Sequence, residues 1–238
     1  LVRMERWGEV IKFAEKTPPR NNLSLAMLNL SLAETGKMGD LMFKFEQNGS
    51  AGLFLHFEKE YVAPMMGSEI FFHLGLVNAS QEYSFESTET TPNLGKMVRS
   101  IKRLAETNLI NGNYKVAEKY LKLLGKTIFY RKWAKDTERY LYNEDMINKH
   151  PVWGEKRRMM IKKDFFFKVE NMESVLNMLL RDYTQNKIAY QYLMAFYLIN
   201  KDLRNFMDRV PMMNDLGYKN IPVSYQEAIM YIIGLSSK

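Results

Sequence analysis

The sequence contains no cysteine, which excludes a disulfide framework, a thiol nucleophile and any cysteine-ligated zinc or iron–sulfur site. Histidine is also scarce, with three residues in 238, so histidine-based catalysis and metal binding have little to work with. With 13 glycines and 7 prolines, the chain is unlike a loop-rich all-β sandwich or a low-complexity segment. What remains is an ordinary globular composition, 46% hydrophobic and 26% charged.

Long apolar runs are absent as well. The longest stretches without Asp, Glu, Lys or Arg are Asn21–Ala33 and Ile188–Asn200, each 13 residues long. A membrane-spanning helix needs about 20 apolar residues, so we expect this segment itself to be soluble. The chain begins at Leu1, without an initiator methionine or the apolar core of a signal peptide, and we expect it to be a piece of a longer protein.

Apolar residues recur at spacings of three and four along most of the chain, which predicts amphipathic helices. Short polar turns separate several of these helices and predict antiparallel helix pairs. The turns are Thr35-Gly36-Lys37, Asn111-Gly112-Asn113 and Asn200-Lys201-Asp202. We expect less regular helices around residues 70–78, 132–143, 172–183 and 224–234. The only β-like run, Asp164–Val169, has no obvious partner strand and is interpreted as the bulky start of the next helix.

One pair of predicted helices, within residues 95–126, resembles the tetratricopeptide repeat. The positions that carry the resemblance are Leu104, Ala105, Gly112, Tyr114, Ala117, Leu121 and Leu124. Glycine permits the tight turn between the two helices, and alanine lets neighbouring helices approach closely. The resemblance implies an all-α fold, an α-α superhelix built as a tetratricopeptide-like solenoid of antiparallel helix pairs with irregular repeats. We expect ten to thirteen helices in a single domain, residues 1–238.

Three further phrases resemble a family of uncharacterised bacterial membrane-anchored proteins, which place a multi-span membrane region before a helical-repeat region. The phrases are Leu32-Ala33-Glu34-Thr35-Gly36, Phe72-His73-Leu74-Gly75 and Leu104-Ala105-Glu106-Thr107-Asn108. This resemblance implies that the chain is the C-terminal, extramembrane part of a protein of the cell envelope. It also implies membrane attachment only through a segment upstream of this chain, and it supplies no activity.

Positive charge is concentrated in the middle of the chain. Residues 1–93 have a net charge of −4, residues 94–170 of +10 and residues 171–238 of +1. The basic residues of the middle section include Lys96, Arg99, Lys102, Arg103, Lys115, Lys119, Lys122, Lys126, Lys156, Arg157 and Arg158. One interpretation is a docking surface for an acidic partner, an anionic headgroup layer or nucleic acid. The other is an ordinary solvated face, because the lysines from 115 to 126 recur opposite apolar positions.

The tetratricopeptide resemblance also implies where a partner would bind. In that family the first helix of each pair lines a concave groove, which here places Arg99, Lys102, Glu106 and Leu109 in the groove. Arg103 completes the set of residues that we expect to bind a partner. The family's carboxylate-binding version needs an asparagine where this chain has Glu106, so we do not expect capture of a chain terminus. Lys102 and Glu106 are four residues apart and are expected to form an ion pair.

No motif identifies an enzyme. The chain lacks a nucleophile elbow and both glycine-rich phosphate-binding motifs. His56 and His73 have Glu58, Glu60 and Glu69 near them in sequence, but no pair has the spacing that places metal ligands on one helical face. We expect these histidines to be satisfied and partly buried. The sequence therefore predicts no catalytic residue, metal or cofactor.

The main functional hypothesis is a non-catalytic protein-interaction or scaffolding module that binds another protein or peptide. The alternative is binding of a polyanion, nucleic acid or an anionic membrane surface, through the basic middle section. Specific nucleic acid is disfavoured, because no nucleic-acid module accompanies the aromatic and basic run Phe129–Trp133. A third hypothesis is an enzyme with an unrecognised site.

Overall fold

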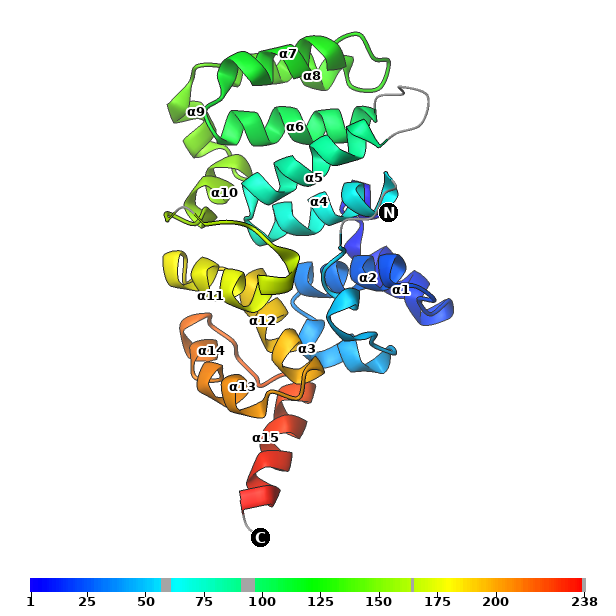
Figure 1. Cartoon of the computed structure of the whole chain (residues 1–238), viewed down its shortest axis with the longest axis vertical. Helices are drawn as coiled ribbons and strands as arrows, with labels where there is room; N and C mark the ends of the chain where they lie inside the picture. The colour runs from blue at the N-terminus through cyan, green and yellow to red at the C-terminus, as the bar shows by residue number, and fades with distance from the viewer. Residues whose placement is uncertain (57–60, 91–96, 164, 237–238) are drawn as a thin grey trace. The chain divides into compact units, whose positions relative to one another are not determined.

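The computed structural model describes residues 1–56, 61–90, 97–163 and 165–236. These residues form fifteen α-helices and several short 3₁₀ turns, without a strand (Figure 1). Consecutive helices pack against each other, most closely in antiparallel pairs, as expected for an α-α superhelix. The predicted all-α class is therefore confirmed. The chain divides into two compact units, one made of Leu1–Leu55 with Phe166–Lys238 and the other of His56–Phe165. The single domain remains a prediction.

Fifteen helices exceed the ten to thirteen expected, because several are very short. Examples are α3 (Met38–Leu41), α9 (Glu144–Lys149) and α14 (Met212–Asp215). Helices of four to six residues make fewer than two turns and therefore leave no clear periodic pattern in a sequence. None of the described helices is long and apolar enough to cross a membrane.

The helix pairs share one kind of turn. After α2 (Asn22–Glu34), α4 (Val62–Leu74), α6 (Val98–Ile110) and α12 (Lys187–Ile199), a residue with positive φ reverses the chain. That residue is Gly36, Gly75, Gly112 or Lys201. The next N–H then bonds to a carbonyl five residues back, as from Asn113 to Asn108 at 2.8 Å. The positive-φ residue itself also donates its N–H, as from Gly112 to the Leu109 carbonyl at 3.1 Å. Together the two bonds satisfy carbonyls at the helix end that would otherwise lack a partner.

The turn at Gly75 corrects one prediction. Residues 70–78 were expected to form one helix, but the chain reverses there and begins α5 (Val77–Glu89). Gly75 has φ of 92° and approaches the side chain of Met159, leaving no room for a Cβ. The prediction for the β-like run was also wrong, because residues 165–168 are neither helix nor strand and Val169–Asn171 forms a 3₁₀ turn. Asp164 lies outside the described residues.

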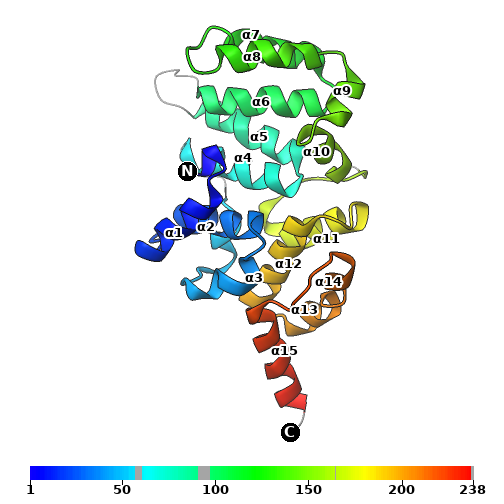
Figure 2. The ribbon, with the colours of Figure 1, turned by 180° about the vertical axis from the view of Figure 1, so that it is seen from behind.

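The second unit stacks α4, α5, α6, α7 (Tyr114–Leu124) and α8 (Arg131–Thr137) in chain order, followed by α9 and α10 (Trp153–Met159). Both ribbon views show α7 and α8 side by side, with α7 against α6 (Figures 1 and 2). The apolar positions between α6 and α7 are buried: Leu104, Ala105, Ala117, Leu121 and Leu124 are at most 2% exposed. Helices α4 and α5 approach closely at Gly67, which has no side chain. A Cβ at this position would lie 2.7 Å from the Tyr83 ring.

The first unit packs α1 (Trp7–Lys16) against α2, and α11 (Met172–Asp182) against α12. The helices α13 (Leu203–Arg209) and α15 (Val223–Ser236) complete the unit with α3 and α14. The side chain of Asn21 caps α2 by accepting a bond from the Ser24 N–H at 2.8 Å. Predicted helices at residues 172–183 and 224–234 correspond to α11 and α15.

Candidate functional site

The residues predicted to bind a partner lie on α6, and burial separates them. The side chains of Arg99, Lys102, Arg103 and Glu106 are 15%, 28%, 11% and 9% exposed. Leu109 is completely buried in a core cluster that includes Ile110, Ala117 and Trp153. Leu109 therefore holds the unit together and does not face a groove, contrary to the expectation from sequence.

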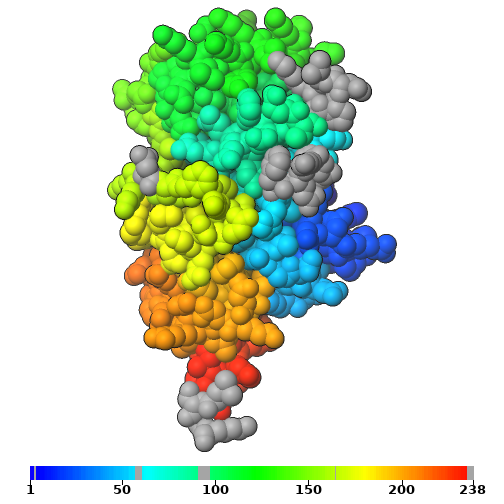
Figure 3. Space-filling view, in the orientation of Figure 1, coloured from blue at the N-terminus to red at the C-terminus, as the bar shows by residue number. Residues whose placement is uncertain are grey.

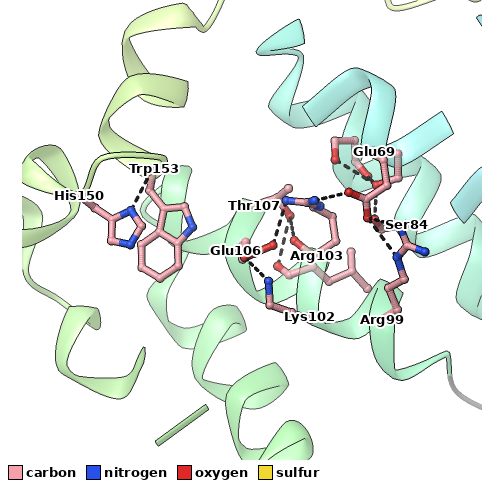
Figure 4. A network of polar contacts seen from close by, with 12 residues as sticks. Glu69, Ser84, Arg99, Lys102, Arg103, Glu106, Thr107, His150 and Trp153 are labelled. Carbon is pink, nitrogen blue, oxygen red and sulfur yellow. Dashed lines mark hydrogen bonds and ion pairs between the residues drawn. The ribbon is translucent and has the colours of Figure 1, made fainter. Parts of the chain in front are cut away.

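The four charged residues meet a fifth, Glu69 of α4, in a continuous set of ion pairs (Figure 4). Arg103 is central: its Nη2 lies 2.6 Å from Glu69 Oε2 and its Nη1 lies 2.9 Å from Glu106 Oε2. Arg99 Nη2 lies 3.1 Å from Glu69 Oε1, and Lys102 Nζ lies 2.6 Å from Glu106 Oε1. The Lys102–Glu106 pair confirms the predicted interaction. We call these five residues the α6 ion-pair network.

The electrostatics of the network fix its protonation. Burial alone would raise the pKa of Glu69, but the nearby positive charges of Arg103 and Arg99 outweigh this effect and lower that pKa to about 2. Glu69 is therefore a permanent carboxylate near neutral pH. General acid–base catalysis needs a pKa near the working pH, so this carboxylate is unsuited to proton transfer.

Aromatic rings complete the surroundings of the network. The Arg103 guanidinium lies 3.5 Å from the centroid of the Phe72 ring, and Lys102 Nζ lies 4.8 Å from the centroid of the Trp133 ring on α8. Both contacts have the geometry of cation–π interactions. The basic side chains of α6 thus have anionic and aromatic neighbours within their own unit, which weakens α6 as a surface for an acidic partner.

The partners of Glu69 were not predicted, because Glu69 lies close to His73 in sequence and far from the arginines of α6. His56 is exposed, against expectation, whereas His73 is 8% exposed on α4. Glu58 and Glu60 lie outside the described residues, and the described residues contain no group of three histidines or carboxylates that could hold a metal ion. A signal for the true role was present: Glu69 is the only charged residue between Tyr61 and Gln81, and a carboxylate in an apolar helix requires a cation.

Two basic residues of α10 donate hydrogen bonds to carbonyls at the C-terminal ends of α4 and α6. Lys156 Nζ donates to the carbonyl of His73, near the end of α4, at 2.8 Å. The Arg157 guanidinium donates to the carbonyls of Ile110 and Leu109, at the end of α6, at 2.7 and 3.2 Å. Positive side chains at helix C-termini complete the hydrogen bonding and oppose the negative end of the helix dipole. These two charges are structural.

The third histidine also has a local role. The His150 ring stacks on the Trp153 ring with centroids 4.0 Å apart, and its Nδ1 accepts the Trp153 backbone N–H at 3.1 Å (Figure 4). Only a ring whose Nδ1 carries no proton accepts this bond, and burial lowers the pKa of His150 accordingly. His150 is thus a neutral cap at the start of α10.

Four further basic residues lie on the outer side of α7 and in the turn that follows it. Lys115, Lys119, Lys122 and Lys126 are exposed, as both the docking interpretation and the solvated-face interpretation require. The space-filling view shows α7, in bright green, at the surface of the second unit (Figure 3). Lys96 lies outside the described residues.

The turn between α7 and α8 combines charge with apolar surface. Ile128 and Phe129 are each 87% exposed, the highest exposure among the large hydrophobic side chains of the described residues. Lys126, Arg131 and Lys132 are the exposed cations closest to them in sequence. We call residues 126–132 the α7–α8 tip. From Lys119 to Lys135, the chain has six basic residues and no acidic one.

The comparisons with known proteins give a family and no activity. A family model described as a family of unknown function, DUF6057, matches residues 1–237. No curated protein matches the chain, and no solved structure matches it.

Proposed function

This chain belongs to the DUF6057 family, and we propose that it is a non-catalytic interaction module that docks on a partner with an acidic surface. A single observation carries the proposal. The α7–α8 tip exposes two large apolar side chains, Ile128 and Phe129, within a stretch that has six cations and no acidic residue. Exposed apolar groups with a charged surround are typical of docking sites.

We place the docking site on the α7–α8 tip, whereas the sequence alone favoured α6. The cations of α6 are held by Glu69 and Glu106, and separating them would cost the energy of buried ion pairs. The cations of the tip need no such separation, because they are exposed and have no acidic residue beside them in sequence. An acidic partner would therefore gain most at the tip.

The non-catalytic character is supported by the local roles of the groups that an enzyme would need. Glu69 is a permanent counter-ion, with its pKa lowered to about 2 by Arg103 and Arg99 against the opposing effect of burial. His150 is occupied as a helix cap. Each group thus contributes to stability, and neither is poised for proton transfer.

The wider setting of the module is part of the same proposal. We take the second unit as a degenerate tetratricopeptide-like array, which is supported by the shared turn geometry after α4 and α6. The sequence resemblance to bacterial membrane-anchored proteins favours the extramembrane part of an envelope protein. The partner in that setting is a protein, a peptide or the membrane surface.

An affinity capture tests the docking function. Extracts of the source cells, separated into soluble and membrane fractions, are passed over the immobilised chain and over the variant I128S/F129S. A component retained by the native chain and lost with the variant supports docking at the tip. The matched control is F13S, which removes an aromatic side chain that is 61% exposed on α1, in the other unit. Equal recovery from all three forms would contradict the proposal.

A further inference from the structure

We infer that the acidic partner of the α7–α8 tip is an anionic lipid surface, into which Ile128 and Phe129 insert while the surrounding cations contact the headgroups. This inference rests on the proposed docking function and names its partner. The observations that carry it are the ordered turn, the position of the apolar pair and the distribution of charge.

The turn presents Ile128 and Phe129 in a defined way. Thr127 Oγ1 accepts the Tyr130 N–H at 3.2 Å and donates to the Leu124 carbonyl at 2.7 Å. The Thr127 carbonyl also accepts the Arg131 N–H at 3.2 Å. These bonds hold the backbone on both sides of the apolar pair. A preorganised apolar tip loses little conformational entropy when it enters another phase.

Of the large apolar residues in and next to the turn, some pack against the core and others face solvent. Tyr130 and Trp133 pack against a core cluster that contains Ile101 and Leu121. Ile128 and Phe129 do not share that packing and remain 87% exposed. Other side chains therefore cover the core of the unit, and Ile128 and Phe129 remain accessible. We call this exposed pair the apolar wedge.

The charge around the wedge suits a lipid surface better than a protein. A specific protein interface buries about 800 Å² on each partner and centres on well-packed apolar pockets. Here the apolar contact is confined to two adjacent side chains, whereas the cations extend along α7 over several turns. Shallow apolar insertion combined with a broad cationic field is the chemistry by which peripheral proteins attach to anionic membranes.

Co-sedimentation with vesicles tests the inference on the full chain. Vesicles of phosphatidylcholine alone are compared with vesicles of phosphatidylcholine mixed with phosphatidylglycerol, at low and at physiological ionic strength. We expect binding only to the mixed vesicles and weaker binding at the higher salt concentration. Removing three cations in K126Q/R131Q/K132Q is expected to lower the partition constant about 100-fold, since each cation near the surface contributes a factor of about five.

The apolar wedge has its own variant. Because buried apolar side chains each contribute strongly to transfer from water, I128S/F129S is expected to lower the partition constant at least about tenfold. The matched controls lie in the first unit: F13S for the wedge, and K12Q/K16Q/K219Q for the cations, all at exposed positions. Neither control should change vesicle binding. Circular dichroism of every variant checks that its fold is retained.

The outcomes separate this inference from the proposed function. The native chain could fail to bind either type of vesicle but bind a polyglutamate peptide, with that binding lost in the tip variants. This result would overturn the lipid inference and leave the docking function standing. If the controls lower vesicle binding as much as the tip variants, the tip is not the lipid site and the inference also fails. If neither vesicles nor polyglutamate bind and the affinity capture recovers nothing through the tip, both proposals are overturned.

Discussion

Two neighbouring helices of the second unit, α6 and α7, carry similar numbers of basic residues and use them in opposite ways. On α6, the charges of Arg99, Lys102 and Arg103 are largely buried and engaged by Glu69 and Glu106. On α7, the lysines are exposed, and Lys122 forms an ion pair with Glu118 of its own helix. The number of charges on a helix therefore says little about its function until the neighbouring side chains are known.

The cause lies in what surrounds each helix. Helix α6 packs against α5, α7 and α10, so most of its circumference is covered and its charges must find partners inside the unit. Helix α7 packs against α6 and α8 and keeps an outer face in solvent. A charge that is already compensated contributes to stability, whereas an exposed one remains available for binding.

The greatest loss of stability should follow from removing Glu69, the carboxylate that two arginines of α6 share. Glu69→Gln keeps the shape of the side chain but leaves the buried guanidinium groups of Arg99 and Arg103 with less negative charge. Breaking a buried ion pair from one side typically costs about 3–5 kcal/mol, so we expect a loss of that size in the free energy of unfolding. Urea denaturation followed by circular dichroism measures it.

The matched control for this variant is Glu118→Gln, which breaks an exposed pair with Lys122 on α7. Exposed ion pairs contribute little to stability, so the denaturation midpoint should hardly move. A similar loss in both variants would contradict the contrast between the two helices, because it would show that burial does not decide the role of the charge.

Acid should weaken the same network. The pKa of Glu69 is lowered from its ordinary value of 4.5 to about 2, by Arg103 and Arg99 acting against burial. A carboxylate with a lower pKa in the folded state stabilises the fold fully above about pH 4.5, and that contribution is lost as the pH falls towards 2. The shift corresponds to about 3 kcal/mol. Unfolding free energies of the native chain should fall across this range by more than those of Glu69→Gln.

The helix pairs were predictable because their signals are local. The turn at Asn111-Gly112-Asn113 needs one glycine with positive φ between two apolar stripes, and all of this is visible within a short stretch of sequence. Gly75 was missed because the residues around it are apolar on both sides and contain no polar turn signal. Local patterns likewise identified which side of α7 is exposed.

The fate of the α6 charges was not predictable in the same way. Glu69 is 34 residues from Arg103, and Arg157 is 47 residues from the Ile110 carbonyl that it caps. Which cation is compensated depends on how distant helices stack, and periodicity carries no information about that pairing. The predicted binding residues on α6 were accordingly brought together by the fold, but as an internal network with Leu109 in the core.

An intermediate effect is expected from two adjacent arginines of α10. Arg157 donates to the last carbonyls of α6, whereas Arg158 is exposed. Arg157→Gln should lower the free energy of unfolding by about 1–3 kcal/mol, because partly buried carbonyls lose their donors. Arg158→Gln should change it by less than about 0.5 kcal/mol. Thermal and urea denaturation of the two variants in parallel measure both losses. Because each variant removes one positive charge, a difference between them shows that the contacts of the arginine determine the loss of stability.

The smallest effect on stability is expected on α7 itself. Replacing Lys115, Lys119 and Lys126 by glutamine alters only exposed side chains, and surface substitutions of this kind change the free energy of unfolding by less than about 0.5 kcal/mol each. The same variant should lose most of its affinity for anionic vesicles, because it removes three of the four exposed lysines of α7 and the turn that follows it, and one of the three belongs to the α7–α8 tip. Denaturation and vesicle co-sedimentation on one preparation measure both. A large loss of stability would mean that α7, like α6, uses its cations to hold the fold, and the contrast between the two helices would disappear.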